Sequence, residues 1–107
     1  MSKYLFIESR DPFESPDVKQ QWDLATTLAG KGNDVTMFLV QNAVFAARRE
    51  ARVPTLDPTA EVTVLADDLS LAERGIPEKG LRENVGVSGI DALVDLIMED
   101  GRKPIWT

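Results

Sequence analysis

Short runs of consecutive apolar residues alternate along the chain with longer stretches in which apolar and polar residues mix. Runs over 3–9 (KYLFIES), 35–40 (VTMFLV) and 61–66 (EVTVLA) are typical of strands buried on both faces, because a half-exposed strand would alternate instead. Between the first two runs, apolar residues recur at roughly helical spacing, at Trp22, Leu24, Ala25, Leu28 and Ala29. Asp17 is the predicted N-cap of this helix, and the glycine-rich segment 30–33 (GKGN) ends it.

The second half of the chain continues this alternation with shorter elements. One helix is predicted over 43–52 (AVFAARREAR), where a following proline stops it, and a short helix is predicted over 69–74. Ser88 is a candidate N-cap for a last helix. That helix carries an apolar stripe at Ile90, Leu93, Val94, Ile97 and Met98. Gly101 stops it, and 103–107 (KPIWT) forms a final short strand.

Strands that alternate with helices and are apolar on both faces predict an α/β fold, in which a parallel sheet lies between two helical layers. The chain has 107 residues, which is the size of one domain, so we expect residues 1–107 to form a single domain. The first apolar run meets charge at Glu8 and is too short for a signal peptide or a membrane-spanning helix. We therefore expect a cytoplasmic protein that does not bind membranes.

Composition excludes several kinds of chemistry. The chain has no cysteine and no histidine, so it has no thiolate nucleophile, no disulfide, no histidine metal ligand and no Ser-His or Cys-His catalysis. The formal net charge is −6, with 18 acidic and 12 basic residues, which argues against nucleic-acid binding through a basic surface. We expect no metal and no cofactor, and we assign no catalytic residue. The sequence leaves open whether the chain is an enzyme.

Polar residues follow each of the three predicted strands. Ligands of open parallel sheets bind outside the carboxyl ends of the strands. This rule gives a candidate ligand-binding pocket formed by Ser9, Arg10, Asn42, Asp67 and Ser70.

Two charged groups allow more than one interpretation. Asp67 and Asp68 precede the short helix over 69–74, where a carboxylate can cap the helix or bind a cation. We favour a cap for one of them and a solvated side chain for the other. A basic cluster in the helix predicted over 43–52 can be a solvated helix end, or it can contact an anion or a neighbouring subunit. This cluster comprises Arg48, Arg49 and Arg52.

Three segments together resemble the DsrE/DsrF/DsrH-like family, which includes sulfur-relay subunits of the TusD type. They are FLVQNAVFAA (38–47), VTVLADDLSLAERGI (62–76) and GIDALVDLIMEDGRKPIW (89–106). The resemblance implies a three-layer α/β/α sandwich with a mostly parallel sheet of about five strands, and 85–87 (VGV) is the best candidate for the additional strand. Active members of the family carry a persulfide on a cysteine at the end of the third strand, and this position is Asp67 here. A carboxylate cannot carry a sulfane sulfur, so the family's sulfur transfer is not expected.

The resemblance also implies homotrimers, hexamers or mixed assemblies. We therefore expect a catalytically silent DsrE-like protein, linked to intracellular sulfur metabolism, that acts as an oligomeric subunit or a small binding module. A trimer or hexamer is favoured physically as well, because so short a chain buries a modest fraction of its surface, and Phe13, Phe45 and Trp106 fall near predicted loops or ends. Two alternatives stay open. One is a divergent enzyme or a small-ligand or anion-binding protein that uses the strand-end residues, and the other is a structural partner of a cysteine-bearing DsrE-family paralogue.

Overall fold

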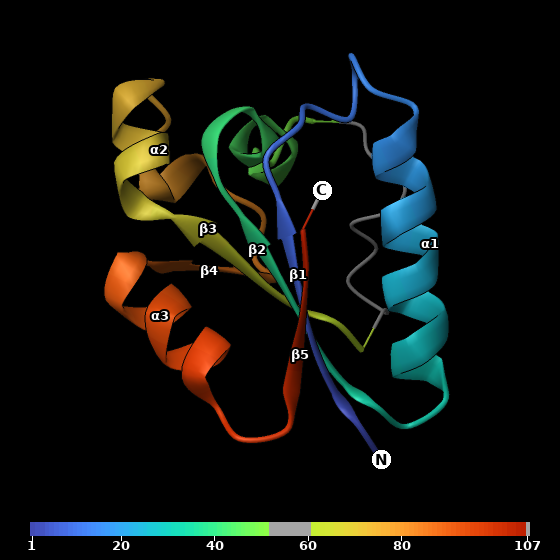
Figure 1. Cartoon of the computed structure of the whole chain (residues 1–107). Coiled ribbons are helices and arrows are strands. Elements are labelled where there is room, and N and C mark those ends of the chain that lie inside the picture. Colours follow the sequence, from blue (N-terminus) through green and yellow to red (C-terminus); the bar gives the residue numbers. More distant parts are fainter. Residues whose placement is uncertain (52–60, 107) are drawn as a thin grey trace.

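Within the described residues, 1–51 and 61–106, five parallel strands form one sheet in the computed structural model, in the order β4-β3-β2-β1-β5 (Figure 1). The strands are β1 (Lys3–Glu8), β2 (Asp34–Leu39), β3 (Thr63–Asp67), β4 (Val85–Ser88) and β5 (Arg102–Trp106). Because the strands are parallel, their carboxyl ends meet at one edge of the sheet. The segments that follow β1, β2 and β3 all begin at this edge, which is where the sequence placed the candidate pocket.

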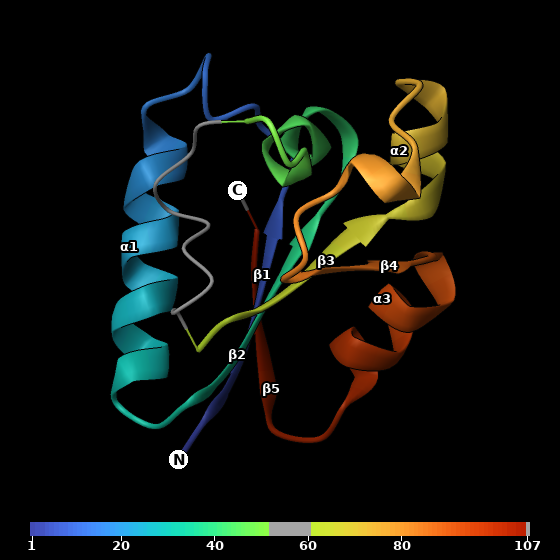
Figure 2. The same cartoon turned by 180° about the vertical axis from the view of Figure 1, so that it is seen from behind.

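Helices cover both faces of the sheet, which makes the fold the expected three-layer α/β/α sandwich (Figures 1 and 2). α1 (Asp17–Gly30) and the 3₁₀ helix η1 (Gln41–Ala47) pack on one face, and α3 (Ile90–Met98) packs on the other. α2 (Asp68–Glu73) follows β3 directly, and a 3₁₀ turn, η3 (Glu78–Gly80), lies between α2 and β4. In the part of the chain that the structure describes, no helix is long and apolar enough to cross a membrane.

The two faces of the sheet bury cores of different size. On the α1 side, the core is anchored by large side chains that are almost fully buried, among them Trp22, Phe6, Met37, Leu39 and Val44. On the α3 side, the buried residues are Leu5, Ile7, Phe38 and Leu93. α3 has nine residues against the fourteen of α1, and fewer buried residues belong to the core beneath it.

The strands and the glycine stops were predicted correctly to within about two residues. The additional strand is β4, over Val85–Ser88. Gly32 ends α1 with φ at +87°, and its N–H donates to the carbonyl of Ala29 over 3.0 Å. Gly75 follows α2 with φ at +66°. Both glycines adopt the left-handed conformation that terminates helices and that other residues rarely adopt.

The helix predicted over 43–52 is only partly correct. The structure has a 3₁₀ helix that ends at Ala47, after which Arg48 adopts extended backbone and forms an antiparallel bridge with Leu81. This long-range pairing outweighs the helix propensity of the local sequence. Arg48 and Arg49 therefore do not share a helix with Arg52, which lies outside the described residues.

Two predicted helix caps are also wrong. Asp17 is the first residue of α1, and the N-cap is Pro16, which makes no side-chain hydrogen bond. Ser88 is the last residue of β4, where it is paired in register with Asp67, so α3 starts one residue later with Gly89 as its N-cap. The final strand was predicted over 103–107 without a pairing partner. In the structure it is β5, which pairs with β1. Thr107 lies outside the described residues.

Candidate functional site

The carboxyl ends of β2 and β3 are linked by a short series of hydrogen bonds. Ser70 Oγ donates to Asp67 Oδ2 over 2.6 Å and accepts from the backbone N–H of Gln41 over 2.9 Å. The backbone N–H of Ser70 also donates to Asp67 Oδ2, over 3.0 Å, so Asp67 is the N-cap of α2. Asp68 is exposed. The structure thus confirms that one carboxylate of the pair caps the helix while the other is solvated.

Gln41 marks the turn from β2 into η1. Its φ is +51°, in the left-handed region that costs a residue other than glycine on the order of 1 kcal/mol. The hydrogen bond from its N–H to Ser70 Oγ offsets part of this cost. The β2–η1 turn and the start of α2 therefore form one connected unit.

Arg74, just after α2, adds a second link between the same two segments. Its Nε and Nη2 both donate to Asn42 Oδ1, over 3.1 and 3.0 Å, and its Nη1 donates to the carbonyl of Ser70 over 3.2 Å. Asn42 therefore fixes the direction of the Arg74 guanidinium. Three of the five predicted site residues, Asn42, Asp67 and Ser70, belong to this one hydrogen-bonded region.

The other two predicted site residues lie after β1. The backbone N–H of Arg10 donates to the buried Glu8 Oε1 over 3.1 Å, and its Nη1 forms an ion pair with Asp17 Oδ2 over 3.2 Å. The guanidinium of Arg10 is thus engaged with the start of α1. Ser9 is half-buried at the end of β1.

A pocket of about 290 Å³ opens beside Arg74, and none of the five residues picked by the strand-end rule lines it. Phe45 and Arg48 come from η1 and the residue after it, whereas Arg74 and Ile76 come from the segment after α2. The two segments lie about thirty positions apart in the sequence, so no local spacing announces the pocket. Two lining residues did carry a signal in the sequence, since Arg48 belongs to the basic cluster and Phe45 falls near a predicted loop or end.

The cap at Asp67 leads to a stability prediction. Asp67→Ala should lower the free energy of unfolding by about 0.5–2 kcal/mol, because the backbone N–H of Ser70 loses its acceptor. Asp67→Asn should cost much less, because asparagine caps about as well as aspartate. Urea denaturation followed by circular dichroism measures both changes.

The matched control for this prediction is Asp68→Ala. Asp68 is exposed in the first turn of α2, so its loss should cost no more than the helix-dipole effect, about 0.3–1 kcal/mol. If Asp67→Asn were as destabilising as Asp67→Ala, the residue would be needed for its charge, and the capping role would be contradicted.

Comparisons with known proteins found one family model and similar solved structures. The model of the DsrE/DsrF-like family matches residues 2–103. The fold is similar to the crystal structure of the ychN protein from E. coli, with a TM-score of 0.83 and 22% sequence identity over 98% of this chain and 100% of that chain. It is also similar to MTH1491 from Methanobacterium thermoautotrophicum, a protein of unknown function, with a TM-score of 0.83 and 18% identity over 100% of both chains. No curated protein matches significantly. The chain belongs to the DsrE/DsrF-like family.

Proposed function

We propose that this chain is a catalytically silent DsrE-like subunit that works by associating with further copies of itself. The chain has no cysteine, so it has no atom on which the family's persulfide could form. Asp67, at the position that the resemblance gives to that cysteine, is engaged as a helix cap. In this proposal the protein serves an intracellular sulfur-handling assembly as a structural or binding component, not as a sulfur carrier.

The observation that carries this proposal is the exposed apolar face of α3. The sequence predicted one apolar stripe on this helix, but the stripe divides in the structure. Leu93 packs toward the sheet, whereas Ile90, Val94 and Met98 are 64%, 49% and 77% exposed. These three residues are spaced by four positions, so they lie along one side of the helix. An apolar face of this kind on a small acidic protein is typical of an interaction surface.

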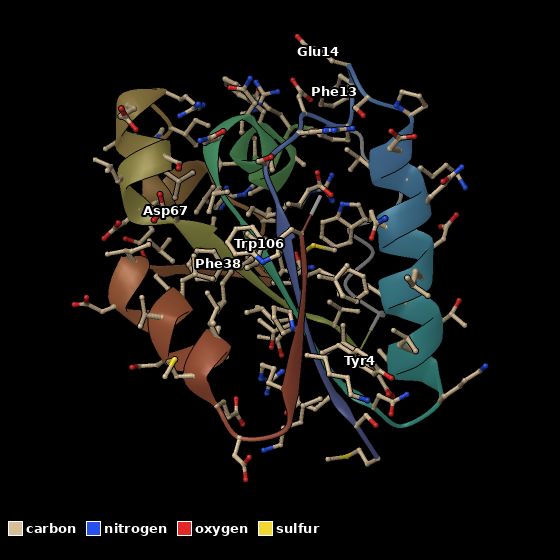
Figure 3. All side chains as sticks on the ribbon, viewed as in Figure 1. Tyr4, Phe13, Glu14, Phe38, Asp67 and Trp106 are labelled. Atoms are coloured by element: carbon tan, nitrogen blue, oxygen red, sulfur yellow. The ribbon has the colours of Figure 1, made fainter. Side chains whose placement is uncertain are left out.

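Trp106 is a further exposed apolar residue on the same face of the sheet. It pairs in register with Ile7 of β1, and Ile7 pairs with Phe38 of β2, both of which belong to the core beneath α3. Figure 3 shows the Trp106 side chain pointing from β5 toward Phe38. Trp106 is nevertheless 67% exposed. A large aromatic ring left in water contributes strongly to an interface when a partner covers it.

A second copy of this chain is the occupant that we favour for the surface formed by Ile90, Val94, Met98 and Trp106. The resemblance to DsrE-like proteins implies homotrimers or hexamers. In the isolated subunit, the core beneath α3 also contains fewer buried residues than the core on the α1 side. Covering the α3 face in an oligomer would supply the missing burial.

Light scattering coupled to gel filtration tests this proposal. We expect the protein to elute as a trimer or hexamer of the 11.8 kDa chain at micromolar concentrations. Val94→Asp should weaken the association by roughly thirtyfold or more, because it places a charge in an apolar interface. Leu24→Asp is the matched control, because Leu24 is an exposed apolar residue on α1, on the opposite face.

The control variant should retain the oligomer, and circular dichroism should show both variants folded. An 11.8 kDa monomer across micromolar concentrations of the unmodified protein would overturn the proposal. So would an oligomer that Leu24→Asp disrupts and Val94→Asp does not.

A further inference from the structure

The pocket between η1 and the segment after α2 is held open by backbone contacts. Arg48 and Leu81 form an antiparallel bridge, the N–H of Arg49 donates to the carbonyl of Gly80 over 2.8 Å, and the N–H of Arg82 donates to the carbonyl of Ala47 over 3.0 Å. Figure 2 shows η1 and this later segment running side by side. The two walls of the pocket are therefore fixed relative to each other before any ligand binds.

Two arginines share the aromatic ring of Phe45 at this pocket. The guanidinium carbon of Arg48 lies 5.2 Å from the ring centroid, and that of Arg74 lies 6.0 Å from it. A cation over an aromatic face is attracted to the ring, which offsets part of the repulsion between the two positive charges. Both side chains line the pocket.

The hydrogen bonds of these two arginines go to neutral acceptors. Arg48 Nε donates to the carbonyl of Phe45 over 2.9 Å, and Arg74 donates to the side chain of Asn42 and the carbonyl of Ser70. Within residues 1–51 and 61–106, no carboxylate forms an ion pair with either of them. The chain carries 18 acidic residues, yet in the part that the structure describes neither guanidinium is paired with a carboxylate.

The rest of the lining is mixed. Phe45, Ile76 and Pro77 provide apolar surface, and Glu50 contributes one carboxylate. Two guanidinium groups against one carboxylate leave the lining with a net positive charge. Because a guanidinium presents paired N–H donors, it matches the two oxygens of a carboxylate or a phosphate.

We propose that this pocket binds a small organic oxyanion, a carboxylate or phosphate group attached to an apolar body. Arg48 and Arg74 bind the oxyanion, the apolar body contacts Ile76 and Pro77, and Asn42 positions Arg74. Glu50 opposes binding through its negative charge. The site is independent of the self-association proposed for α3, because it uses none of the residues of that surface.

Titration calorimetry with simple probes tests this site. Phenyl phosphate and benzoate supply an oxyanion on an apolar ring, inorganic phosphate supplies the oxyanion alone, and benzyl alcohol supplies the ring alone. We expect phenyl phosphate or benzoate to bind, and to bind more tightly than either inorganic phosphate or benzyl alcohol. If phenyl phosphate binds more tightly than benzoate, phosphate is the preferred group, and if benzoate binds more tightly, carboxylate is.

Four variants locate the binding. Arg48→Met and Arg74→Met should each weaken the affinity by about tenfold, because each removes charged hydrogen bonds to the ligand. Glu50→Gln should strengthen it, because it removes the opposing charge. Lys79→Met is the matched control, since Lys79 is an exposed cation next to Gly80 that does not line this pocket, and it should leave the affinity unchanged.

Several results would overturn the proposal. Absence of binding by both phenyl phosphate and benzoate at about 10 mM would do so, as would equal affinities for phenyl phosphate and benzyl alcohol, or for phenyl phosphate and inorganic phosphate. An effect of Lys79→Met equal to that of Arg74→Met would indicate nonspecific attraction to positive charge. Glu50→Gln leaves both arginines and their hydrogen bonds in place, so unchanged or weaker binding by this variant contradicts the site even if an arginine variant fails to fold.

Discussion

Replacement of Trp22 with alanine is expected to lower the free energy of unfolding by about 3–5 kcal/mol. Trp22 is the largest fully buried side chain, at 1% exposure, and it joins α1 to the larger core on that face of the sheet. Alanine would leave a cavity that the surrounding strands and helix cannot fill completely. Small domains are stable by about 5–15 kcal/mol, so this one change would remove a large part of the total.

Urea denaturation monitored by circular dichroism measures this loss, and Leu24→Ala on the same helix is its control. Leu24 is 44% exposed, so its truncation should change the stability by no more than about 0.5 kcal/mol. A loss below about 1 kcal/mol for Trp22→Ala would contradict the role of α1 as the anchor of this layer.

α1 also illustrates what the sequence predicts well. Its apolar residues recur at helical spacing and a glycine stops it, and both signals depend only on neighbouring residues. η1 illustrates the limit. The stretch after β2 is rich in alanine and arginine, which favours an α-helix, but Arg48 pairs with Leu81 more than thirty positions away. Such a pairing depends on the assembled fold, so local propensity cannot predict it.

The candidate site also contains some contacts that the sequence predicts and others that depend on the assembled fold. The cap formed by Asp67 and Ser70 is a contact over three residues, and the sequence contains its pattern. The contact of Arg74 with Asn42 joins the end of α2 to the segment after β2, and it depends on β2 lying beside β3. The stripe on α3 is an intermediate case. Periodicity identified its apolar positions, but only the position of the sheet decides that Leu93 is buried and that Val94 is not.

Replacement of Arg102 with methionine should lower the free energy of unfolding by about 3 kcal/mol, at the low end of the range for breaking a buried ion pair. The Arg102 side chain is 4% exposed at the amino-terminal edge of the sheet. It donates to Glu99 Oε2 over 2.7 Å, to Asp34 Oδ2 over 2.9 Å and to the carbonyl of Tyr4 over 3.0 Å. The loss stays at the low end because both carboxylates remain partly exposed to water after the change.

This network also predicts how stability depends on pH. Hydrogen bonds from Arg102, and then from Lys3, lower the pKa of Glu99 from 4.5 to about 2. Above pH 4.5 the Glu99 carboxylate is charged in the folded and the unfolded chain alike, so its pairing stabilises the fold fully there. Between about pH 4.5 and pH 2 the unfolded chain takes up the proton first, so this contribution is lost progressively as the pH falls.

Denaturation curves across this range should therefore show a smaller loss of stability in acid, or acid loss, for Arg102→Met and for Glu99→Gln than for the unmodified protein. Glu73→Gln, at an exposed carboxylate of α2, should keep the full acid loss, and an unchanged acid loss in Glu99→Gln would contradict the assignment.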